Sequence, residues 1–109
     1  MNRPYVKKYG KIKQFTIFFV DGEYIRNNID DAFVLAGHHL AFDYIPENEI
    51  WVEDTVKKAE RMFLIVHEMF ENKLMTLGIE YDPAHDLANI IEAACRKHHT
   101  EIKEILSLI

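Results

Sequence analysis

The sequence contains one cysteine, no long apolar run and no acidic residue in its first twenty positions. Cys95 alone can form neither an intrachain disulfide nor a four-cysteine zinc site, so any metal here would need histidine and carboxylate ligands. The apolar run at residues 17–20 is too short to span a bilayer, and residues 1–8 lack the apolar stretch of a signal peptide. We therefore expect a soluble, cytoplasmic protein with no membrane segment.

Charge is distributed unevenly along the chain. Five basic residues and no acid lie within residues 1–13, whereas the chain beyond residue 20 carries all eighteen acids against eight lysines and arginines. Positive potential is needed for phosphate contacts, so the acidic body argues against a broad nucleic-acid surface and leaves only the basic tip for such a contact. Residues 1–13 are predicted to be a flexible, solvated tip. A phosphate-binding glycine loop and an RNA-binding aromatic signature are both missing from the sequence.

The first half of the chain is rich in residues that favour strands. Residues 14–26 predict a β-hairpin that turns at Asp21-Gly22, because this dipeptide favours the positive φ of a tight turn. Residues 32–45 offer a third extended region, and residues 50–52 a short strand. Strands joined by such short connections predict a small antiparallel sheet of about three to four strands.

The second half predicts two helices, at about residues 55–77 and 83–107, because apolar residues recur there at helical spacing. The short link between them makes the helices antiparallel neighbours. The whole sequence therefore predicts one α+β domain, residues 1–109, in which the sheet packs on the two helices.

A group of histidine and glutamate residues is placed together by these helices. His67 and Glu71 share one face of the first helix, and His85 opens the second helix, with Glu92 following on the same face. An imidazole nitrogen and a carboxylate oxygen at this spacing can bind one metal ion, and a third ligand leaves the fourth position open for water. The helix dipole favours the neutral, metal-binding form of His85. Glu68 is the candidate general base beside such a water.

The pair His67-Glu68, on a helix that follows the strand at residues 50–52, resembles the active-site helix of the zincin metallopeptidases, which carries His-Glu-x-x-His. This resemblance, over about residues 50–92, implies a zinc ion, a water nucleophile and hydrolysis of a peptide or protein substrate. It assigns His67 as a metal ligand and Glu68 as the base. Glu71 stands where the motif has its second histidine, and the third ligand is His85 or Glu92. A carboxylate in that second position makes the metal less Lewis acidic.

The same residues also fit an ordinary structural role. A histidine beside an apolar stripe commonly makes hydrogen bonds at the edge of a core, and Glu71 would then be a surface acid. His38 and His39, if they lie in a strand, point to opposite faces, so at most one of them can join a site.

A second function class is a non-enzymatic α+β module without metal. Its exposed sheet face would present aromatic side chains to a partner protein or to a second copy in a homo-oligomer, since aromatic residues concentrate in interface cores. The aromatic residues expected on that face are Tyr24, Phe42, Tyr44 and Trp51.

Overall fold

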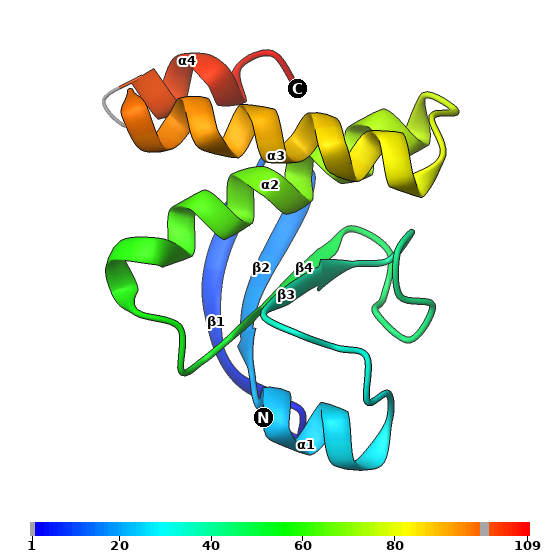
Figure 1. Ribbon diagram of the computed structural model, residues 1–109. Helices are drawn as coiled ribbons and strands as arrows, with labels where there is room; N and C mark the ends of the chain where they lie inside the picture. The colour runs from blue at the N-terminus through cyan, green and yellow to red at the C-terminus, as the bar shows by residue number, and fades with distance from the viewer. Residues whose placement is uncertain (1, 99–100) are drawn as a thin grey trace.

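A computed structural model describes residues 2–98 and 101–109 and shows a β-sheet covered by helices (Figure 1). The elements in these residues, in chain order, are β1 (Tyr5–Ile12), β2 (Phe15–Val20), α1 (Gly22–Asn28), β3 (Ala36–His38), β4 (Glu49–Glu53), α2 (Lys58–Thr76), α3 (Tyr81–Lys97) and α4 (Ile102–Leu106). A small α+β fold, with strands in the first half and the long helices in the second, is therefore confirmed.

The sheet has the strand order β1-β2-β4-β3. β1 and β2 are antiparallel, as are β3 and β4, but β2 and β4 run parallel. The prediction of an antiparallel sheet is therefore wrong for its central pair. A parallel pair needs a crossover connection, and here the chain passes through α1 and β3 before it returns to β4.

The first hairpin lies earlier in the chain than predicted. It joins β1 to β2, and Lys13 in its turn has a φ of 56°. The hairpin predicted to turn at Asp21-Gly22 is wrong, because Asp21 is the N-cap of α1 and its carboxylate accepts a hydrogen bond from the Tyr24 N–H at 3.0 Å. Aspartate favours turns and helix N-caps for the same reason, since its short side chain accepts a nearby backbone N–H.

Most of the basic tip also differs from its prediction. Residues 5–12 form β1, so this part of the tip is a paired edge strand and not a flexible tail. Tyr5 anchors the strand through edge-on contacts with the rings of Phe18 and Trp51 at centroid distances of 4.7 and 5.4 Å. Residue 1 lies outside the described residues.

The two predicted C-terminal helices correspond to α2 and α3, which run in opposite directions (Figure 1). The second is shorter than the expected span of residues 83–107, because α3 ends at Lys97 and α4 begins at Ile102. Residues 99 and 100, between them, lie outside the described residues. None of the helices in residues 2–98 and 101–109 combines the length and the apolar character that a bilayer crossing requires.

α2 is enclosed on two sides. Ile65 and Met69 pack against one face of the sheet, while Val66 and Phe70 pack against Cys95 of α3. Every residue from 65 to 72 is consequently buried. Four of these are polar (His67, Glu68, Glu71 and Asn72), and buried polar groups of this kind need partners inside the protein.

The aromatic residues expected on an exposed sheet face lie elsewhere. Trp51 is only 3% exposed and forms a second apolar cluster with residues of α1 and the loops around β3. Phe42 and Tyr44 are partly buried against this cluster, and Tyr24 belongs to α1. The predicted aromatic docking face is therefore wrong for these residues, because α1 and the loops cover that side of the sheet.

Candidate metal centre

Three donor atoms from α2 and α3 converge in the buried polar region. The Oε2 atom of Glu71 lies 3.1 Å from Nε2 of His67 and 2.8 Å from Nδ1 of His85. The two imidazole nitrogens are themselves 3.3 Å apart. The structure thus brings together the three residues that the sequence nominated as metal ligands, and it places them in one triangle.

The size of this triangle suits a metal ion. Ligand atoms at about 2.0–2.2 Å from a tetrahedral zinc ion lie roughly 3.2–3.5 Å from one another. The separation of 3.3 Å lies within that range and those of 3.1 and 2.8 Å lie below it, and two nitrogens with one carboxylate oxygen are a donor set that zinc accepts. Only a small expansion of the triangle would be needed to accept an ion.

The second nitrogen of His67 faces Glu92. Nδ1 is buried and makes no hydrogen bond of regular geometry among the described residues, although Oε1 of Glu92 lies 3.1 Å away. Metal-bound histidines usually present their other ring nitrogen to a carboxylate in this way. Because Glu92 contacts the nitrogen that points away from the triangle, its position suits a partner of the candidate ligand His67 and not a ligand of the same ion.

The other oxygen of Glu71 is also bonded. Its Oε1 atom lies 2.8 Å from Nε2 of His38, which is fully buried at the end of β3. Burial alone would raise the pKa of Glu71, but the hydrogen bonds from His38, His67 and His85 outweigh it, so the pKa of this carboxyl lies far below its ordinary value. Glu71 is therefore an ionised carboxylate surrounded by imidazoles.

Glu68 lies beside the same triangle, but among the described residues no imidazole donates a hydrogen bond to its carboxyl group. Its Oε2 atom is 3.7 Å from Nε2 of His67, and burial raises the pKa of Glu68 to about 8, with a further contribution from the negative charge of Glu71. For His67, burial favours the neutral form, but Glu71, Glu68 and Glu92 outweigh it and raise the pKa above 6.5. Two neighbouring carboxyl groups with opposite pKa shifts can hold different charges at one pH.

One side of the triangle reaches the surface. The side chain of His85 is 40% exposed, while those of Glu71 and His67 are 2% and 7% exposed. The Tyr81 ring stacks on the His85 ring at a centroid distance of 5.4 Å. Solvent or a small ligand would therefore approach the centre along the N-terminal turn of α3.

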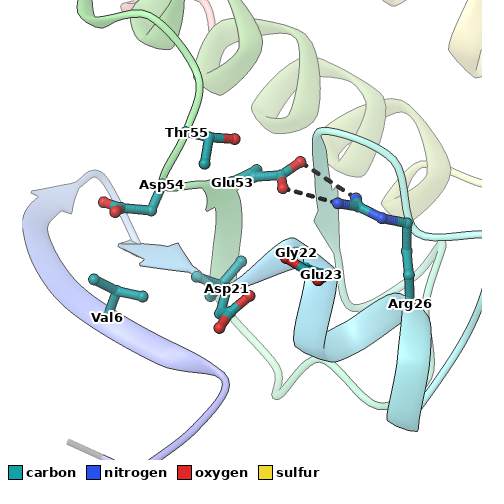
Figure 2. Close-up of a pocket in the computed structure, with 9 residues that line it drawn as sticks. Val6, Asp21, Gly22, Glu23, Arg26, Glu53, Asp54 and Thr55 are labelled. Atoms are coloured by element: carbon teal, nitrogen blue, oxygen red, sulfur yellow. Dashed lines mark hydrogen bonds and ion pairs between the residues drawn. The ribbon is translucent and has the colours of Figure 1, made fainter.

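The pocket drawn in Figure 2 is a different place on the molecule. Its volume is about 380 Å³, and its walls come from β1, the end of β2, α1 and the residues around the end of β4. In Figure 2, Arg26 reaches from α1 to the carboxylate of Glu53, with a nitrogen–oxygen distance of 2.9 Å. No residue of the His67/Glu71/His85 triangle lines this pocket.

Two members of the polar network were not nominated by the sequence pattern. Of the pair His38-His39, strand alternation allowed only one to join a site, and the structure places His38 against Glu71. Asn72 contacts Nδ1 of His38 at 3.2 Å. Its only sequence signal is a position next to Glu71 within an apolar stretch of helix.

Comparison of the chain with known protein families, with curated proteins and with solved structures finds no match.

Proposed function

We propose that this protein is a zinc-binding, zincin-like protein in which His67, Glu71 and His85 are the metal ligands. The observation that carries the proposal is the convergence of their three donor atoms, from two helices, to within 3.3 Å of one another. Two neutral imidazoles and one carboxylate leave the fourth position of a tetrahedral ion free, which is the arrangement of catalytic and not structural zinc sites. The exposed flank of His85 gives that position access to solvent.

The proposed activity is metal-dependent hydrolysis of a peptide or protein substrate. Zinc in such a site supplies a Lewis acid and lowers the pKa of a bound water to about 7. Glu68 is the group placed to take a proton, because its Oε2 atom lies 3.7 Å from Nε2 of His67 at the edge of the triangle. A zinc ion bound in the triangle would lower the pKa of this neighbouring carboxyl group, which would leave Glu68 ionised and able to accept the proton. Glu92 would hold the His67 ring through Nδ1.

The metal content of the purified protein tests the first part of this proposal. Protein prepared without chelator should carry about one equivalent of zinc, measured by atomic emission. His67→Ala and His85→Ala should each lower zinc affinity at least about tenfold, because each removes a direct ligand. His98→Ala is the matched control, since His98 lies on the exposed C-cap of α3. A metal-free wild type, or equal affinity in all four proteins, would rule out the proposed centre.

The hydrolytic part needs a separate measurement. Glu68→Gln should keep the zinc and lose turnover of a peptide substrate, because the amide cannot accept the proton. Turnover by Glu68→Gln at the wild-type rate would remove Glu68 from the role of base, while leaving the metal site intact.

A further inference from the structure

His38 connects the sheet to the candidate metal centre. It is fully buried at the last position of β3, and its Nε2 atom contacts Oε1 of Glu71 at 2.8 Å. Its other nitrogen, Nδ1, accepts a hydrogen bond from the backbone N–H of Leu40 at 3.2 Å. The side-chain amide nitrogen of Asn72 lies at the same distance from Nδ1.

These contacts decide which ring nitrogen of His38 carries the proton. A backbone N–H can only donate, so Nδ1 of His38 must present its lone pair to Leu40. The proton of the neutral ring then resides on Nε2, which donates to Glu71. The amide of Asn72 fits this arrangement, because its oxygen lies toward the Thr76 hydroxyl and its nitrogen toward His38.

This tautomer bears on a second group of potential ligands. Atoms of His38, Glu68 and Glu71 lie within 4.8 Å of one another, which is compact enough to suggest a second ion sharing Glu71. A metal at Nε2 of His38 would require the ring proton to move to Nδ1, where it would face the Leu40 N–H. His38 is therefore a hydrogen-bond donor to Glu71 and not a ligand of a second ion.

We propose that His38 is a positioning residue that makes Glu71 a one-oxygen ligand. A carboxylate can bind a metal through both oxygens, but in this structure Oε1 is held by His38 and only Oε2 faces His67 and His85. The inference rests on the proposed function, and it explains how a glutamate can stand where the zincin motif has histidine. The donated hydrogen bond also draws negative charge away from Oε2, which moderates the loss of Lewis acidity.

Variants of His38 with and without a donor test this role. His38→Leu removes the donor, whereas His38→Gln can place an amide N–H near the position of Nε2 and should rescue it. Zinc affinity, measured by competition with a chromophoric chelator, should fall about 10–100-fold in His38→Leu and by no more than a few fold in His38→Gln. His39→Leu is the control, since His39 shares Asn72 as a neighbour but makes no hydrogen bond to Glu71 among the described residues.

The visible absorption spectrum of bound Co²⁺ distinguishes this positioning role from a merely structural one, because a structural role would leave the spectrum unchanged. The wild type and His38→Gln loaded with Co²⁺ should give the intense visible bands of a four-coordinate ion, and His38→Leu the weaker bands of a higher coordination number. Equal affinity and equal spectra for His38→Leu and wild type would overturn this inference alone. Failure of the wild type to bind zinc would overturn the proposed function together with it.

The tautomer can be measured without any variant or metal. A long-range ¹H–¹⁵N correlation spectrum of the metal-free wild type should show His38 protonated at Nε2 and unprotonated at Nδ1. A ring protonated at Nδ1 would overturn the proposal even if His38→Leu does not fold.

Discussion

At the scale of single residues, the candidate centre contains two carboxyl groups within one turn of α2 whose pKa values shift in opposite directions. Glu71 receives hydrogen bonds from three imidazoles and stays ionised, whereas Glu68 is buried beside that negative charge and holds its proton up to about pH 8. Hydrogen bonding to the charged form lowers a carboxyl pKa, and burial raises it. The two groups therefore hold different charges in the metal-free protein, and a bound cation would be needed to ionise Glu68 for the proposed role of proton acceptor.

The raised pKa of Glu68 predicts how the free energy of unfolding of the metal-free protein depends on pH. The unfolded chain ionises this group near 4.5, but the folded chain keeps the proton to about pH 8, so the free energy of unfolding should fall as pH rises between these values. Glu68→Gln lacks this penalty and should exceed wild type in stability at pH 8 by on the order of 4 kcal/mol, with little gain at pH 4.5. Urea denaturation with a chelator present measures both. A gain of the same size at both pH values would contradict the assignment.

Zinc binding should also depend on pH, through His67. The surrounding carboxylates raise the pKa of His67 above 6.5, and the imidazole must lose its proton before it can bind a metal. The apparent affinity for zinc should therefore weaken progressively as pH falls toward and below 6.5, with protons released on binding. Titration calorimetry in buffers of different ionisation enthalpy would count those protons. Affinity that is constant from pH 5 to pH 8 would argue against His67 as a ligand.

At the scale of elements, Gly22 shows why α1 begins directly after β2. A Cβ atom on Gly22 would lie 2.5 Å from the Glu53 carboxyl group, which Arg26 holds in place from the same helix. A side chain at this position would therefore displace the Glu53 carboxyl group from its place beside Arg26. The Asp21-Gly22 pair thus serves a helix cap and a close contact, although by itself it suggests a hairpin turn.

A double-mutant cycle tests this contact. Gly22→Ala should destabilise the wild type by about 1–3 kcal/mol, because the carboxyl group of Glu53 has to move away from Arg26. In a Glu53→Ala background the same substitution should cost little or even stabilise α1, since alanine is a better helix former than glycine. Thermal or urea unfolding of the four proteins gives the coupling energy. Additive effects would show that Glu53 is not the obstacle.

At the scale of the whole molecule, the candidate centre ties three layers together. Two of the proposed ligands come from α2 and one from α3, and His38, which lies beside Glu71, comes from the sheet. α2 lies between the sheet and α3, so an ion bound here would fasten α3 to the rest of the domain. The metal would then contribute to stability as well as to chemistry.

Zinc should therefore raise the melting temperature. A ligand present at 100 times its Kd stabilises the folded state by about 2.7 kcal/mol, which for a domain of this size corresponds to a shift on the order of 10 °C. Calorimetry with and without chelator measures the shift, and His85→Ala, which lacks the ligand from α3, should lose most of it. An unchanged melting temperature in wild type across zinc concentrations would contradict a structural link through the ion.

Much of the candidate centre is built from residues that lie close together along the chain, so the sequence alone could predict that they meet. His67 and Glu71 are one helical turn apart, so helical periodicity alone puts them on one face, and the short link to α3 brings His85 within reach. The class of fold follows from the same local patterns. The predicted turn at Asp21-Gly22 failed because a cap and a turn use the same residue types for the same hydrogen bond.

Only the tertiary structure decided the rest. His38 lies 33 residues before Glu71, and its contact depends on β3 pairing beside β4 at the edge of a partly parallel sheet, which no local pattern encodes. The placement of Glu92 at the far nitrogen of His67 likewise depends on how α3 packs against α2. The sequence by itself determined which chemical groups share a helix face. Packing between elements determined which of them meet, which atoms they present, and which are shielded from water.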